Sequence, residues 1–71
     1  MNVAERLSRE IVRVTVLRAA YVHGDNPLSV PNTVAVIAIM TAAIETGHNA
    51  AGSGSVVKMM SAIRTLEGFT A

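Results

Sequence analysis

An uncharged run of eleven residues, at positions 34–44, constrains the fold of this chain more than any other feature. The run reads VAVIAIMTAAI, and as a helix it presents apolar side chains around its whole circumference. It is well short of the ~20 residues that a helix needs to cross a bilayer, so we expect no membrane partner. The run therefore predicts a helix that is buried on all sides.

Turn-forming residues divide the chain into three segments that carry periodic apolar residues. Two clusters rich in Gly, Asn, Pro and Ser lie at positions 23–27 and 47–55. We predict helices over 3–22, 30–46 and 55–67. The fold class expected is all-α: a compact three-helix chain, forming a single helical domain over 1–71, that assembles into a helical homo-oligomer.

The first segment is an amphipathic helix with a signal for its start. Asn2 and Glu5 have the spacing of a capping box. At 100° per residue, one face collects the apolar residues Val3, Leu7, Ile11, Val14 and Tyr21, and the opposite face collects Glu5, Arg6, Arg9 and Arg13. Positions 11–17 also alternate with a period of two and are rich in β-branched residues, so a short strand there is the alternative.

The other two helices also have start and stop signals. Ser29 and Pro31 suit the first turn of the second helix, and Gly47 predicts its end in the left-handed conformation. Ser55 is the expected cap of the third helix, and Gly68 its stop. The third helix carries an apolar stripe of Val56, Met59, Met60, Ile63 and Leu66.

Composition limits the ways in which so short a chain can be stabilised. The 71 residues include no cysteine, which excludes disulfides and thiolate zinc sites and fits a reducing compartment. The start MNVAER lacks the pattern of a signal peptide, so we expect a cytoplasmic protein. A net charge of +1 provides no strong field for nucleic acid.

Assembly is the expected source of stability. Apolar residues make up 51% of the chain and charged residues 15%, which is more apolar side chain than a lone small domain can easily bury. A symmetric homo-oligomer is the default solution, and docking on a different protein is the alternative. The residues predicted to form the interface are Val12, Val16, Ala35, Val36, Ala38, Ile39 and Ala42.

Two features suggest a site for a small anionic ligand. Arg18 falls within the apolar stripe of the first helix, where it needs either a partner such as Glu45 or Glu67, a path to solvent, or a bound anion. The stretch 52–58 offers free backbone N–H groups, two hydroxyls and a lysine, although a flexible linker with a Ser cap has the same pattern. The candidate residues are Arg18, Ser53, Gly54, Ser55, Lys58 and Arg64.

Neither catalysis nor a metal is indicated. His23 and His48 are expected in the two loops, without helical i, i+4 spacing and without cysteine, which makes a poor metal site. The serines lack the turn that surrounds a nucleophile, so we expect no catalytic residue and no cofactor.

The function expected is therefore contact with other molecules. The sequence indicates a small non-enzymatic helical oligomer of the adaptor or inhibitor type. One alternative is an oligomeric binder or scavenger of a phosphate-bearing, nucleotide-like ligand at a subunit interface. The other is a helix-turn-helix DNA-binding protein that uses 55–67 as recognition helix, against which stand the weak charge and a nine-residue turn.

Overall fold

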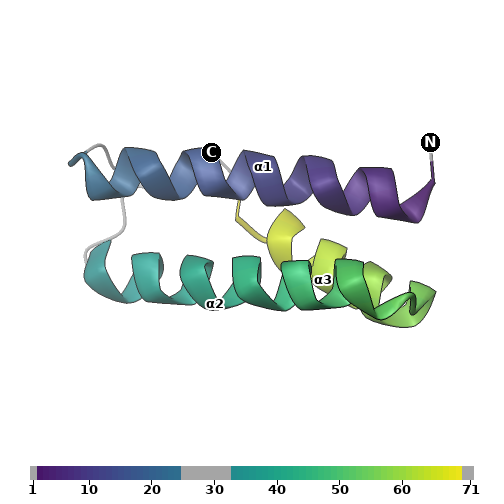
Figure 1. The fold of residues 1–71 in the computed structure, drawn as a ribbon. Helices are drawn as coiled ribbons and strands as arrows, with labels where there is room; N and C mark the ends of the chain where they lie inside the picture. The colour runs from purple at the N-terminus through teal and green to yellow at the C-terminus, as the bar shows by residue number, and fades with distance from the viewer. Residues whose placement is uncertain (1, 25–32, 70–71) are drawn as a thin grey trace.

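Three helices account for the part of the chain that the structure describes. The computed structural model describes residues 2–24 and 33–69, which form α1 (Val3–Val22), α2 (Thr33–Ser53) and α3 (Val56–Glu67). α1 and α2 run antiparallel, and α3 turns back from the end of α2 to lie behind the pair (Figure 1). The molecule measures 36 × 20 × 16 Å. The predicted all-α class is confirmed, and the alternative strand at 11–17 is wrong because these residues lie inside α1.

α1 begins at its predicted cap and buries four of the five predicted residues; Val3 is half-buried, and Leu17 is buried in addition. The Asn2 Oδ1 accepts a hydrogen bond from the Glu5 backbone N–H at 2.8 Å, which satisfies one of the free donors at the helix start. The residues that α1 buries lie on one face: Leu7, Ile11, Val14, Leu17 and Tyr21. Periodicity alone determined this orientation, because the apolar stripe has only one way to face the other helices.

α2 does not stop at Gly47, and this prediction is wrong. The helix continues to Ser53, and the left-handed glycine after it is Gly54, with φ of +72°. Gly47 lies at a close approach instead, because a Cβ there would lie 3.1 Å from Ile11 Cγ1 and 3.4 Å from Leu66 Cδ1. The expected loop at 47–55 shrinks to Gly54 and Ser55, and His48 lies on a helix. Ser29 and Pro31 lie outside the described residues.

α3 starts at its predicted cap but buries fewer residues than its sequence suggests. The Ser55 Oγ accepts from the Lys58 backbone N–H at 3.2 Å. Met59, Ala62, Ile63 and Leu66 are buried, whereas two members of the predicted stripe, Val56 and Met60, are 54% and 45% exposed. The helix ends at Gly68, which is right-handed, with φ of −65°.

Part of α2 is exposed to solvent because α3 is short. α3 has 12 residues, against 20 in α1 and 21 in α2, so it covers only part of the length of the other two. The core joins the three helices through residues such as Leu7, Met40 and Leu66, each fully buried. Farther toward the start of α2, Val34 is 79% exposed and Ile39 57% exposed. Within one chain, α2 is therefore covered on only part of its circumference, and burial of the rest by assembly stays a prediction.

The length of α2 also changes the argument about membranes. Because the helix continues through Gly47 to Ser53, the eleven-residue run at 34–44 is only part of a longer helix. Within the 20-residue stretch Val34–Ser53, a window of 18 residues has a mean hydropathy of 1.3, and 22% of that window is buried inside the protein. By length and composition alone it is long enough to cross a bilayer. Core helices of soluble proteins have the same property, so it does not by itself identify a membrane protein.

Candidate interaction surface

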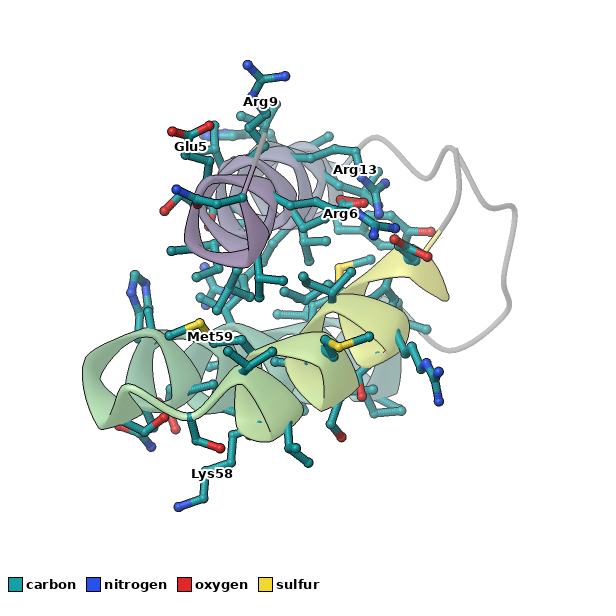
Figure 2. The ribbon with its side chains drawn as sticks, turned by 90° about the vertical axis from the view of Figure 1, so that its right-hand side faces the viewer. Glu5, Arg6, Arg9, Arg13, Lys58 and Met59 are labelled. Atoms are coloured by element: carbon teal, nitrogen blue, oxygen red, sulfur yellow. The ribbon has the colours of Figure 1, made fainter. Side chains whose placement is uncertain are left out.

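The outward face of α1 carries two exposed valines among charged residues. Val12 is 62% exposed and Val16 is 65% exposed, and they lie one helical turn apart. Figure 2 shows Glu5 and Arg9, on the same face, pointing away from α2 and α3. We call this face the α1 outer strip, and all its members are exposed: Glu5, Arg9, Val12, Val16, Ala19 and His23.

The outward face of α2 carries small and aliphatic residues. We call it the α2 outer strip, and its members are Val34, Ala35, Ala38, Ile39 and Ala42, all exposed. The alanines would allow the backbone of another helix to come close. Val36, also predicted for the interface, is half-buried and packs against the core, so it contributes to the fold of the single chain.

Exposed apolar residues also lie on α3, where the sequence did not indicate them. Val57 is 78% exposed and lines a shallow pocket of about 260 Å³ with Met60, Ser61 and Arg64. Val56 and Met60 were expected in the core stripe. The sequence did contain a signal for an exposed apolar residue on this helix: Val56 and Val57 are consecutive, and consecutive residues of a helix do not lie on the same face.

Arg18 makes a hydrogen bond between α1 and α2. Its Nε donates to the Thr41 Oγ1 at 2.7 Å, and the Thr41 hydroxyl donates to the Ile37 carbonyl at 2.8 Å. Glu45 lies beside Arg18 in a pocket of about 210 Å³, but no ion pair joins the two among the described residues. The half-buried Arg18 thus donates to a neutral acceptor, and a carboxylate partner was only one of the alternatives that its position suggested.

The other residues predicted to bind an anion lie elsewhere in the chain. Lys58 lines a pocket of about 250 Å³ between α2 and α3, and Arg64 lines pockets on α3 that share no residue with the Arg18 pocket. The Ser53 hydroxyl donates to the Ala50 carbonyl and accepts from the Ser55 N–H beyond Gly54. A single chain therefore does not gather these groups around one ligand, and the anion site stays a prediction.

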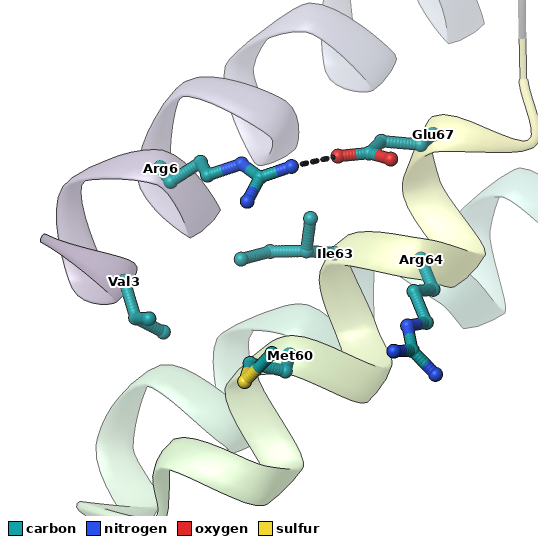
Figure 3. Close-up of a pocket in the computed structure, with 6 residues that line it drawn as sticks. All are labelled: Val3, Arg6, Met60, Ile63, Arg64 and Glu67. Atoms are coloured by element: carbon teal, nitrogen blue, oxygen red, sulfur yellow. Dashed lines mark hydrogen bonds and ion pairs between the residues drawn. The ribbon is translucent and has the colours of Figure 1, made fainter. Parts of the chain in front are cut away.

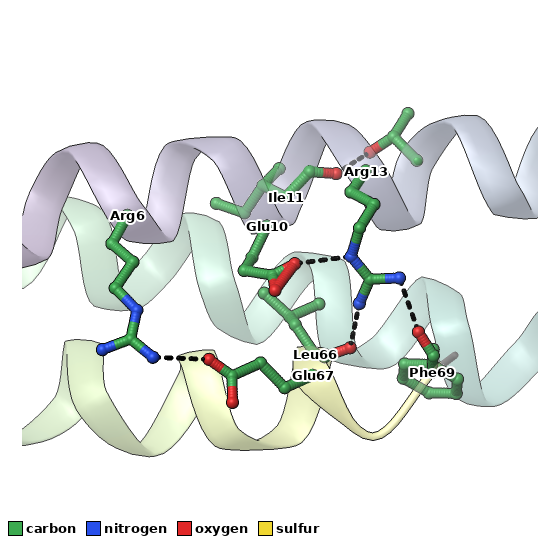
Figure 4. Close-up of polar contacts among 8 residues, drawn as sticks. Arg6, Glu10, Ile11, Arg13, Leu66, Glu67 and Phe69 are labelled. Atoms are coloured by element: carbon green, nitrogen blue, oxygen red, sulfur yellow. Dashed lines mark hydrogen bonds and ion pairs between the residues drawn. The ribbon is translucent and has the colours of Figure 1, made fainter. Parts of the chain in front are cut away.

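Arg13 fastens α1 to the end of α3, a role that the sequence pattern did not predict. Its guanidinium donates to the Glu10 Oε2 at 2.7 Å, to the Leu66 carbonyl at 2.8 Å and to the Phe69 carbonyl at 2.6 Å (Figure 4). The two carbonyls lie at the C-terminal end of α3, where backbone acceptors lack partners inside the helix and a cation is favourable. The helical wheel placed Arg13 on the solvent side, because it carries no information on where the third helix lies.

Arg6 and Glu67 make a second link between the same helices. The Arg6 Nη2 lies 2.8 Å from the Glu67 Oε1, and both side chains are about half exposed. They border a pocket of about 240 Å³ with Val3, Ile63 and Arg64 (Figure 3). Glu67, which the sequence suggested as a partner for Arg18, is therefore paired with Arg6 instead.

The described residues include no group of three His, Cys, Asp or Glu side chains placed to hold a metal ion. His23 follows the end of α1, and His48 lies on α2. Comparison of the chain with protein families, with curated proteins and with solved structures gives no match. The surfaces described above are therefore the basis for a functional proposal.

Proposed function

We propose that this chain is a small non-enzymatic interaction protein that associates with itself through the α1 and α2 outer strips. The observation that carries the proposal is the exposure of Val12, Val16, Val34 and Ile39, each more than half accessible to water. Such aliphatic surface is costly for a small soluble chain and is typical of a surface that meets another protein.

The size of the pockets favours association with a protein over the binding of a small ligand. The four pockets described above measure about 210 to 260 Å³, below the ~300 to 1,000 Å³ of typical ligand sites. A phosphate-bearing ligand would have to use residues from more than one copy of the chain, because Arg18 and Lys58 line separate pockets. This alternative therefore depends on assembly as well.

The DNA-binding alternative has weaker support. Its recognition helix would be α3, whose outward face mixes Lys58 and Arg64 with the exposed apolar residues Val57 and Met60. Base and phosphate contacts call for polar and basic side chains, and the net charge of the whole chain is only +1. α2 and α3 are also joined by only Gly54 and Ser55, whereas a helix-turn-helix has a turn of ~3 to 4 residues.

Membrane association is a second candidate, favoured by the hydropathy of Val34–Ser53. Against it, this stretch contains Glu45 and supplies core residues such as Met40 that contact the other helices. Flotation with vesicles of neutral lipid distinguishes the candidates. A self-associating soluble protein stays in the dense fraction, and a membrane protein rises with the lipid.

The mass of the purified protein in solution tests the proposal. We expect light scattering to give a mass above that of one chain, increasing with concentration. Changing Val12 and Val16 together to Asp should lower this mass, and so should changing Val34 and Ile39 together to Asp. Val57→Asp is the matched control, because Val57 is 78% exposed and belongs to neither strip.

Circular dichroism of each variant must show the helix content of the parent protein. All substituted side chains are largely exposed, so the fold should tolerate them. A single-chain mass for the unmodified protein up to millimolar concentration would contradict the proposal. So would an unchanged mass in both double variants.

A further inference from the structure

We infer that the α1 outer strip pairs with the same strip of a second copy, antiparallel and around a twofold axis at the level of residue 14. This inference rests on the proposed self-association and adds the partner surface and its direction. Along α1 and its C-cap residue His23, the six members of the strip are separated by steps of four, three, four, three and four residues. That alternation is the spacing of a helix seam that packs along another helix.

The strip is complementary to itself when its direction is reversed. Reversal about residue 14 exchanges Val12 with Val16, Arg9 with Ala19, and Glu5 with His23. A twofold interface requires this property, because the same patch must serve both subunits. Antiparallel pairing would set valine against valine at the centre of the contact on both sides of the axis.

The flanking pairs also fit in size and charge. The small Ala19 leaves room for the long stem of Arg9 from the second copy, whose guanidinium reaches solvent at the edge. At each end the Glu5 carboxylate lies opposite the imidazole of His23, which can donate a hydrogen bond to it. All of these side chains are exposed in the single chain; Glu5, Arg9 and Ala19 lie on one face of α1, and His23 is its C-cap residue.

Charge disfavours the parallel arrangement of the same strips. In a parallel pair, each position would face its own copy across the axis. Arg9 would then lie against Arg9 and Glu5 against Glu5, and like charges in contact oppose association. The antiparallel direction avoids both clashes with the same residues, so the order of charges along α1 determines the direction.

Engineered cysteines test the direction directly, because the chain contains no cysteine of its own. In the antiparallel pair, Val12→Cys of one copy faces Val16→Cys of the other. The two copies of position 12 do not face each other. They are offset along the helix axis by four residues, which is ~6 Å at ~1.5 Å per residue, and this offset adds to the distance between the two helices. A disulfide requires Cα atoms within ~7 Å, so only the mixed pair should be linked.

The two full-length variants, one of them labelled with ¹⁵N, are mixed in a glutathione redox buffer, and the linked species are counted by intact mass. We expect the mixed dimer to exceed the two single-variant dimers together by about tenfold. In denaturant, random pairing should make about half of the dimers mixed. Val57→Cys is the control for chance collision, and it should give no dimer above the denatured level.

Charge exchange provides an independent measurement. Glu5→Lys alone and His23→Glu alone should each raise the Kd of self-association about threefold to tenfold. The double variant, E5K with H23E, should return the Kd toward that of the unmodified protein, because the introduced lysine and glutamate attract each other across the interface. Helix content is followed by circular dichroism, since a lysine in the first turn of α1 also affects the helix itself.

The outcomes separate this inference from the proposed function. Preferred linking of each single variant to itself would show a parallel pair and overturn the inference, while self-association would stand. A protein that self-associates without linking in any arm would show that the strip is not the interface. A single-chain mass for the unmodified protein would end both proposals.

Discussion

Gly47 of α2 lies directly against Ile11 of α1, so close that a Cβ on Gly47 would come within 3.1 Å of the Ile11 Cγ1. Glycine is a poor residue for the interior of a helix, and it costs about 1 kcal/mol relative to alanine. The contact explains why it is accepted here: the side chain of Ile11 occupies the space beside Gly47 that a Cβ would need. The glycine of α2 that lacks such a contact is Gly52, where a Cβ would meet nothing within 4 Å.

We therefore expect opposite effects from the same substitution at these two glycines. Gly52→Ala should raise the free energy of unfolding by up to about 1 kcal/mol, through helix propensity alone. Gly47→Ala should lower it by about 1 to 2 kcal/mol, because overpacking against the branched Ile11 outweighs the same propensity gain. Urea unfolding followed by circular dichroism measures both. An equal gain at the two positions would contradict the close approach.

The Arg13 contacts should contribute more to stability than the Arg6–Glu67 ion pair. Arg13→Ala removes hydrogen bonds to two carbonyls at the end of α3 and should cost about 1 to 2 kcal/mol. Arg13→Lys should recover only part of this loss, because an ammonium cannot form the guanidinium fork. Arg6→Ala is the control and should change the free energy of unfolding by less than about 0.5 kcal/mol, since the pair is exposed. Similar costs at the two arginines would show that Arg13 has no special role.

The hydrogen bond between Arg18 and Thr41 should be measurable as a coupling energy. Thr41→Val removes the acceptor of the Arg18 Nε and should cost about 1 kcal/mol. Thr15→Val is the matched control, because the Thr15 hydroxyl donates only to the Ile11 carbonyl of its own helix. In an Arg18→Met background the cost of Thr41→Val should shrink by about 0.5 to 1 kcal/mol. Additive effects of the two changes would mean that the bond contributes nothing.

The capping serine of α3, Ser55, should contribute more to the free energy of unfolding than Ser61, an exposed serine in the middle of the same helix. Ser55→Ala removes the oxygen that accepts from the Lys58 N–H and should cost about 1 kcal/mol. Ser61→Ala, in the middle of the same helix and exposed, should be neutral or stabilise by a few tenths of a kcal/mol. Thermal unfolding of the two variants side by side checks the difference. Equal melting temperatures would argue against the cap.

The candidate surface was accessible to sequence reasoning only in part. Val12 and Val16 could be recognised because both lie off the apolar stripe of α1, and the structure places both in solvent. Val36 and Ile39 could not be assigned to the core or to the surface in the same way. Every side of that run is apolar, so the sequence pattern does not distinguish a buried face from an exposed one. The structure turns Val36 toward the core and leaves Ile39 57% exposed.

The sequence by itself determined the features that depend on neighbours along the chain. The caps at Asn2 and Ser55 are made within three residues, and the buried face of α1 follows from the period of one helix. Only the tertiary structure decided where α2 ends, where Arg13 finds its acceptors and which apolar residues remain in water. Each of these depends on contacts between residues far apart in sequence, such as Gly47 with Ile11, and local patterns do not specify how closely two helices approach.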